Sequence, residues 1–123
     1  MGDESSRGVG VLVVDDDASI RLLCRLNLEL EGWTVREAAT LGEAREQLAD
    51  GTVRIVLLDV HVGSEDGASF IGEIRVNHPE ARVAMLTGVA GRPPLGAAPP
   101  DRVITKPFTL DELTATVADL ARR

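Results

Sequence analysis

Hydrophobic residues follow two alternating patterns along the chain. Short Val, Ile and Leu runs bounded by polar residues are typical of strands buried on both faces of a sheet, and they predict strands at 9–14, 34–38, 53–59, 83–86 and 102–104. Between them, apolar residues recur every three or four positions and predict helices at 20–30, 40–49, 68–77 and after Thr109. Alternating strands and helices predict a doubly wound α/β fold, with a parallel sheet covered by helices on both faces.

Local signals define several helix ends. Thr40 with Glu43, and Thr109 with Glu112, have the spacing of a capping box, in which the side chain of the first residue and the carboxylate of the second satisfy free N–H groups. Gly32 is placed to end the first helix.

The pattern breaks after the fourth strand. Residues 88–101 contain two Pro-Pro pairs and three glycines, and each proline inside a helix costs about 3 kcal/mol. We therefore expect the fourth helix to be missing or degenerate, with Val89 to Asp101 holding no α-helix longer than one turn and being among the most mobile segments. The last strand, Arg102 to Ile104, should then expose an edge to a partner or to a second copy of the chain.

Composition changes this picture only in part. The 123 residues suffice for one domain, which we expect at 9–123 after a flexible tail at 1–8. The net charge of −7 argues against direct nucleic-acid binding. We expect no membrane segment, because no apolar run reaches about 18 residues. A single cysteine suits a reducing compartment, and we expect a cytoplasmic location.

Candidate chemistry lies where the strands end. Asp15 and Asp16 follow the first strand, Asp59 ends the third, Thr87 ends the fourth and Lys106 follows the fifth. In a parallel sheet these groups meet at one edge. Each pair of like charges at about 4 Å would cost about 4 kcal/mol at an effective dielectric constant near 20, so the carboxylates need a cation such as Mg²⁺ or Mn²⁺. Acids, a hydroxyl and a lysine together favour phosphoryl binding, with Asp59 as the nucleophile.

In this order, and with Asp66–Gly67 in the intervening loop and Pro107–Phe108 after the lysine, the chain resembles the receiver domain of two-component response regulators. The resemblance covers nearly the whole chain. It implies a flavodoxin-like (βα)₅ fold with a five-stranded parallel sheet in the order 2-1-3-4-5.

The resemblance also implies a metal site. Asp16 and Asp59 would bind Mg²⁺ directly, Asp15 would act mainly through water, and the backbone carbonyl of His61 would be a further ligand.

For phosphoryl transfer, the resemblance implies that Asp59 accepts the group from a sensor histidine kinase or a histidine phosphotransfer protein. Thr87 would hydrogen-bond the phosphoryl group, and Lys106, with a cis bond to Pro107, would pair with it. Such a domain is not an enzyme beyond assisting its own phosphorylation and dephosphorylation. Its partners would include a downstream effector or output domain, and a homodimer is a further option.

Two positions depart from the family pattern, whereas Gly88, where a small residue, often alanine, follows the threonine, is acceptable. Gly63 stands where a proline is usual. Val103 replaces the aromatic switch residue, so a switch based on an aromatic rotamer cannot operate in its usual form. The missing aromatic and helix keep open a second hypothesis, a receiver-like interaction module that works without phosphorylation.

A third hypothesis is a phosphatase of the haloacid-dehalogenase type. Asp15 would be its nucleophile and Asp17 its acid/base, with Thr87 and Lys106 as later motifs. Ala18 stands where that family has glycine, and neither a cap domain nor a terminal acidic motif is present in the sequence.

Overall fold

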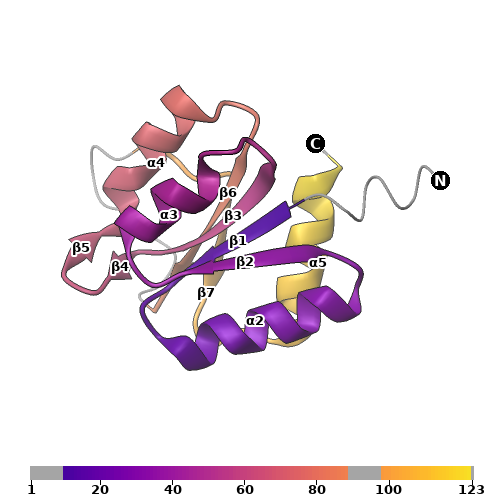
Figure 1. The fold of residues 1–123 in the computed structure, drawn as a ribbon. Coiled ribbons are helices and arrows are strands. Elements are labelled where there is room, and N and C mark those ends of the chain that lie inside the picture. The colour runs from indigo at the N-terminus through magenta and orange to yellow at the C-terminus, as the bar shows by residue number, and fades with distance from the viewer. Residues whose placement is uncertain (1–9, 89–97, 123) are drawn as a thin grey trace.

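The computed structural model describes residues 10–88 and 98–122 (Figure 1). The predicted tail at 1–8 lies outside the described residues, and so does most of the segment from Val89 to Asp101. Within that segment, residues 98–101 are described, and they are not helical.

Five strands form the main sheet, and all of its neighbouring pairs are parallel. These strands are β1 (Gly10–Val14), β2 (Thr34–Ala38), β3 (Val53–Asp59), β6 (Arg82–Thr87) and β7 (Arg102–Thr105). Their spatial order is β2-β1-β3-β6-β7. Counted within this sheet alone, the order is 2-1-3-4-5, so the predicted topology is confirmed.

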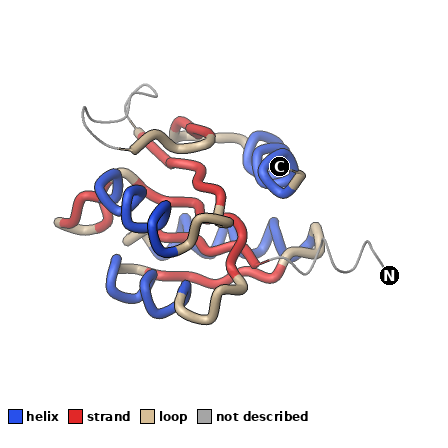
Figure 2. The backbone as a smooth tube through the Cα atoms, turned by 90° about the horizontal axis from the view of Figure 1, so that it is seen from above, coloured by secondary structure: helices blue, strands red, loops and turns tan. Residues whose placement is uncertain are grey.

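Four helices in the described residues cover the two faces of the sheet, two on each face (Figures 1 and 2). They are α2 (Ala18–Leu30), α3 (Leu41–Leu48), α4 (Gly67–Asn77) and α5 (Leu110–Ala121). One core cluster joins α3 and α4 to alternate strand residues such as Leu12 and Val56, and the other joins α2 and α5 to Val11 and Ile55. This alternation follows from the two-residue period of a strand.

Helix ends agree with most of the sequence signals. Helix α5 has the complete capping box, in which Thr109 and Glu112 each accept a backbone N–H of the other. At α3 the box is only half formed. Thr40 accepts from the Glu43 N–H, but the Glu43 carboxylate accepts from Ala39, one residue before the predicted position.

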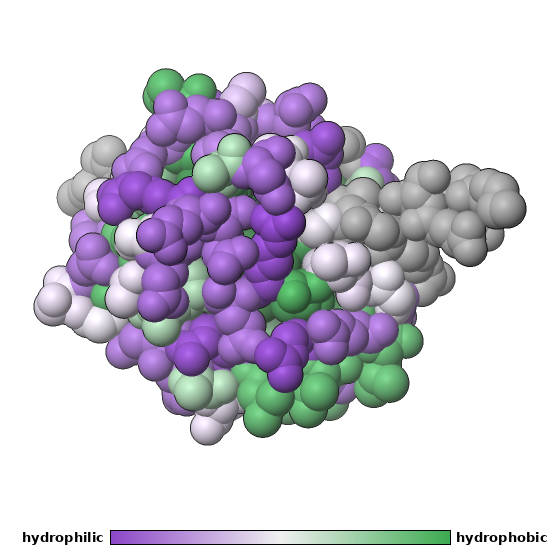
Figure 3. Space-filling model, viewed as in Figure 1, coloured by the Kyte–Doolittle hydropathy of each residue, from purple (hydrophilic) through white to green (hydrophobic). Residues whose placement is uncertain are grey.

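Helix α2 begins at Ala18, two residues before its predicted start, because Asp17 acts as its N-cap and accepts the N–H of Ser19. Its apolar residues cover more of the helix surface than the buried face alone, and a polar stripe of Arg21, Arg25 and Glu29 remains. Cys24 and Leu28 face the core, whereas other leucines of α2 face solvent (Figure 3). We call these the leucine ridge, and they are Leu22, Leu23, Leu26 and Leu30.

A short hairpin follows Asp59 at the end of β3, where the sequence suggested only a polar loop. Strands β4 (His61–Val62) and β5 (Glu65–Asp66) pair antiparallel. Gly63 forms part of the turn with φ of 64°, a conformation that glycine adopts at little cost. The Glu65 carboxylate accepts the N–H of Leu41 at 3.1 Å, which ties this hairpin to the start of α3.

Two further features are the exposure of the last strand of the sheet and the position of the tryptophan after α2. Val103 of β7, the last strand in the sheet order, is 37% exposed, and the open edge of this strand stays a prediction. Trp33 follows α2, donates its backbone N–H to Leu28 and packs in part against the α2 and α5 core. Among the described residues, no helix is both long and apolar enough to cross a membrane.

Candidate functional site at the carboxyl edge of the sheet

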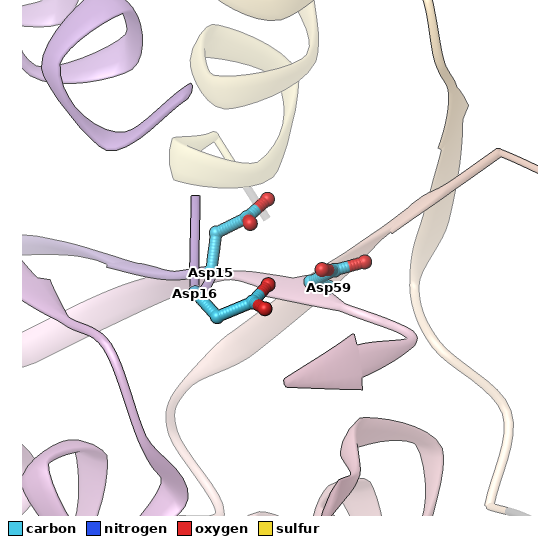
Figure 4. A group of neighbouring side chains, drawn as sticks. All are labelled: Asp15, Asp16 and Asp59. Carbon is cyan, nitrogen blue, oxygen red and sulfur yellow. The ribbon is translucent and has the colours of Figure 1, made fainter. Parts of the chain in front are cut away.

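Three carboxylates meet at the carboxyl ends of β1 and β3 (Figure 4). Asp15 and Asp16 directly follow β1, and Asp59 is the last residue of the neighbouring strand β3. One oxygen from each of the three side chains lies within 4.8 Å of the others. Asp15 is fully buried, Asp16 is exposed and Asp59 is intermediate, with its side chain 14% exposed. The predicted convergence of these acids is present in the structure.

Lys106 extends into the same cluster from the end of β7. Its ammonium lies 2.9 Å from Asp15 Oδ2 and 3.6 Å from Asp59 Oδ1. The Lys106 N–H is bonded to the Thr87 carbonyl at 2.7 Å, which fixes the start of the loop that carries the side chain. The bond from Lys106 to Pro107 is cis, as the resemblance implied.

The charges perturb one another. Burial and the neighbouring charge of Asp15 raise the pKa of Asp59, against the opposing effect of Lys106. Burial alone would lower the pKa of Lys106, but its hydrogen bond to Asp15 and the charges of both carboxylates raise it overall. The Lys106 ammonium therefore pairs with two carboxylates, and the cluster keeps a net negative charge.

An oxygen-only set of this kind fits a hard divalent cation. Three carboxylates with close oxygens can provide the ligands, and one ammonium cannot balance them. The residues therefore could hold a metal ion at this edge.

The remaining predicted residues border the cluster. Thr87, the last residue of β6, is buried at the same carboxyl edge of the sheet as the acid cluster. His61 has an exposed side chain, and its backbone N–H hydrogen-bonds the Asp59 carboxylate. The role of its carbonyl as a metal ligand stays a prediction. Asp17 and Asp66 act as helix N-caps rather than as members of the cluster.

The sequence reasoning missed two residues behind the acids. Arg21 of α2 donates to the Asp15 carbonyl at 2.7 Å and to Glu37 of β2 at 3.1 Å. A signal was present, because a cation in the first turn of a helix faces the positive end of its dipole and needs a specific partner.

Fold and site together define a doubly wound α/β domain with an acidic centre at the carboxyl edge of its sheet. Residues 11–118 match the family model of the response regulator receiver domain. The chain therefore belongs to the receiver domain family, whose members are phosphoacceptor signalling domains of two-component systems.

Individual relatives agree with this assignment. The chain is 34% identical to the response regulator MprA of Mycobacterium ulcerans, over 94% of this chain and 51% of the relative. It is 32% identical to the sensor kinase CckA of Brucella abortus, over 92% of this chain and 12% of that protein. The chain thus spans about half or less of these curated relatives. The crystal structure of the receiver domain of NtrX from Brucella abortus superimposes with a TM-score of 0.79 at 31% identity, covering 91% of this chain and 98% of the other.

Proposed function

We propose that this domain accepts a phosphoryl group on Asp59 from a phosphohistidine of a sensor kinase or phosphotransfer protein, with Mg²⁺ or Mn²⁺ bound at the acid cluster. The observation that carries the proposal is the approach of the Asp15, Asp16 and Asp59 carboxylates to within 4.8 Å, with Lys106 between two of them.

In the proposed reaction, an Asp59 carboxylate oxygen attacks phosphorus and forms an acyl phosphate. The N–P bond of the phosphohistidine breaks, and its electron pair returns to the histidine of the donor. The bound divalent ion would neutralise the charge of the transferring group. Asp16 and Asp59 would bind that ion directly, Asp15 would act through water, and the His61 carbonyl would complete the site.

Two further residues would hold the product. Lys106 already lies 3.6 Å from Asp59 Oδ1, within reach of a phosphoryl group there. The Thr87 hydroxyl would donate to a phosphoryl oxygen. Phosphorylation adds about −1.5 to −2 charges, and their attraction for Lys106 and Thr87 would bias the domain towards another conformation and another partner.

The structure offers support for Asp59 over Asp15 as nucleophile. Asp15 is completely buried and paired with Lys106, and Asp17, the acid/base of the phosphatase hypothesis, caps α2. The family match also argues against that phosphatase hypothesis. The proposed domain is a signalling component rather than an enzyme. It would act in the cytoplasm through an effector or output domain, without direct contact with nucleic acid or membrane.

Labelling with a small-molecule phosphodonor and Mg²⁺ tests the proposal. We expect the wild type to gain one phosphoryl group, and Asp59→Asn to gain none, because an amide is not the required nucleophile. Asp17→Asn is the matched control, since asparagine caps a helix as well as aspartate does, and it should label normally.

Intact-mass spectrometry and peptide mapping would give the result. Undiminished labelling of Asp59→Asn would contradict the assignment of the nucleophile. A wild type that is never labelled would favour the interaction module that works without phosphorylation. Loss of Mg²⁺ affinity in Asp16→Asn is expected from the removal of a charged ligand, and unchanged affinity would contradict that role.

A further inference from the structure

Arg21 extends backwards from the first turn of α2 to the end of β1. Its side chain is only 17% exposed, although a cation at this end of a helix is opposed by the helix dipole. A largely buried guanidinium at an unfavourable position needs specific partners.

Those partners are a carbonyl and a carboxylate. Nη1 of Arg21 donates to the backbone carbonyl of Asp15 at 2.7 Å, and Nε donates to Glu37 Oε1 at 3.1 Å. The other oxygen of Glu37 accepts a hydrogen bond from Arg25 of the same helix. Glu37 thus anchors the guanidinium of Arg21 from the neighbouring strand.

The carbonyl that Arg21 contacts belongs to the peptide group joining Asp15 to Asp16. The Asp15 N–H is bonded to the Ala38 carbonyl at 3.1 Å, and its carboxylate accepts from the Asp17 N–H and from Lys106. With the Arg21 contact, every polar group of Asp15 has a partner. The plane of this peptide sets the direction in which the Asp16 side chain leaves the backbone.

We propose that Arg21 is a positioning residue for the divalent cation site, one that fixes the Asp15–Asp16 peptide and thereby holds both carboxylates ready for the ion. This inference rests on the proposed function. Arg21 acts through the two aspartates and does not touch the ion. Glu37 supports it as the anchor of the guanidinium.

A purely electrostatic role of Arg21 and a positioning role predict opposite changes in cation affinity when Arg21 is removed. If Arg21 acted only through its positive charge, its removal would strengthen binding of another cation to the cluster. If it positions the acids, its removal weakens binding, and loss of such an outer partner typically costs about 10-fold to 100-fold in metal affinity.

Arg36→Ala provides a matched control. Arg36 also bridges a backbone carbonyl, that of Gln47 at 2.7 Å, and a carboxylate, that of Asp50 at 2.7 Å. Neither partner belongs to the acid cluster. The two arginine variants remove the same kinds of contact, but only one lies behind the proposed site.

The experiment is a Mg²⁺ titration of the folded domain without phosphodonor. Calorimetry measures the affinity, and the amide NMR resonances of residues 15 and 16 report binding at the acid cluster. We expect Arg21→Ala to weaken Mg²⁺ binding by about tenfold, and Arg36→Ala to stay within about twofold of wild type. Without Mg²⁺, the amide of Asp16 should exchange faster in Arg21→Ala than in Arg36→Ala.

Arg21→Lys covers the case in which the alanine variant does not fold. It retains the charge but loses the fork that reaches both partners, so it should also bind Mg²⁺ more weakly than wild type. Mg²⁺ binding at or above the wild-type affinity in the folded arginine variants would overturn the inference while leaving the proposed function intact. A wild type that binds no Mg²⁺ would overturn both.

Discussion

At the residue scale, Cys24 shows how burial lowers the reactivity of a thiol. Desolvation raises the pKa of its thiol to about 12, from an ordinary value of 9.0, and the charge of Asp15 adds to the effect. Three pKa units mean about a thousandfold less thiolate at pH 8. We expect alkylation of Cys24 in the native protein to be slower than in the denatured chain by at least this factor, measured by mass spectrometry. Rapid alkylation under native conditions would contradict the buried position.

The same shift predicts a dependence of stability on pH. An acid whose pKa is raised by folding contributes stability that is complete below its unfolded pKa and is lost as the pH rises through the folded value. For Cys24 this window runs from 9.0 to about 12. Cys24→Ala should be less stable than wild type by about 1 kcal/mol at pH 7. Because each pH unit between 9 and 11 costs the wild type up to about 1.4 kcal/mol, the difference should shrink near pH 9 and reverse in sign by pH 11. Urea unfolding at several pH values measures it, and a constant difference would count against the mechanism.

Lys106 should stabilise the fold as well as the proposed product. Lys106→Ala leaves the buried Asp15 carboxylate without its ammonium partner. We expect a loss of about 1–3 kcal/mol, below the range for fully buried pairs because Lys106 is partly exposed. Added Mg²⁺ should recover part of this loss, whereas it should not recover the small loss in Arg36→Ala. Equal stability of Lys106→Ala and wild type without Mg²⁺ would argue against the pairing.

At the element scale, α4 begins against the backbone of the candidate phosphoacceptor. A Cβ atom on Gly67 would lie 1.9 Å from the carbonyl oxygen of Asp59, so no side chain fits there unless the strand end moves. Gly72, in the same helix, has no atom within 4 Å of such a Cβ. Alanine substitutions at these two positions therefore distinguish the effect of a backbone clash from the effect of helix propensity.

We expect Gly67→Ala to destabilise the domain by more than about 2 kcal/mol and to disturb Asp59, because a backbone clash cannot be relieved by a rotamer change. Gly72→Ala should instead stabilise it by about 0.5–1 kcal/mol, the usual gain of alanine over glycine inside a helix. Thermal unfolding of both variants measures the contrast. Similar changes in both would contradict the close contact at Gly67.

The sequence predicts elements better than it predicts the contacts between them. Periodicity identified the five strands of the sheet and the four described helices, because buried strands and amphipathic helices carry strong local patterns. It could not select the buried side of α2, whose apolar residues extend from the buried Cys24 and Leu28 to the exposed Leu22 and Leu26. The β4–β5 hairpin was also missed, because its strands have two residues each and such short strands carry no periodic pattern. The hydrogen bond from the Leu41 N–H to Glu65 was missed because it joins segments 24 residues apart.

The candidate site also contains residues that the sequence could predict and residues that it could not. The acids, Thr87 and Lys106 were predictable because the end of a parallel strand is a defined place in the sheet. For Arg21, the position near the start of α2 indicated only that a partner is needed. The sequence could not identify Glu37 as that partner, because the pair joins a helix to a strand 16 residues away.

At the scale of the whole molecule, the leucine ridge gives the surface an apolar face on an otherwise acidic protein (Figure 3). Leu30 is 84% exposed, whereas Leu28, two residues earlier, is fully buried. We expect Leu30→Lys to change the unfolding free energy by less than about 0.5 kcal/mol and to reduce binding of a hydrophobic dye.

Leu28→Ala is the contrasting variant, and it should cost about 2–5 kcal/mol through the cavity it leaves. Urea unfolding and dye titration of the two variants test the assignment of the helix faces. A large stability loss in Leu30→Lys would show that the ridge is packed against something in the native state.

The position of Trp33 has a consequence for optical measurements. It is the only tryptophan of a chain without tyrosine, so emission excited at 295 nm comes from one known place. Helix α2, with 13 residues, separates it from Asp17 by about 20 Å, too far for direct quenching by an ion at the acid cluster. Mg²⁺ alone should therefore leave the emission of Trp33 almost unchanged. A shift of its spectrum after addition of a phosphodonor would instead report a rearrangement that has travelled through α2 to the opposite end of the sheet.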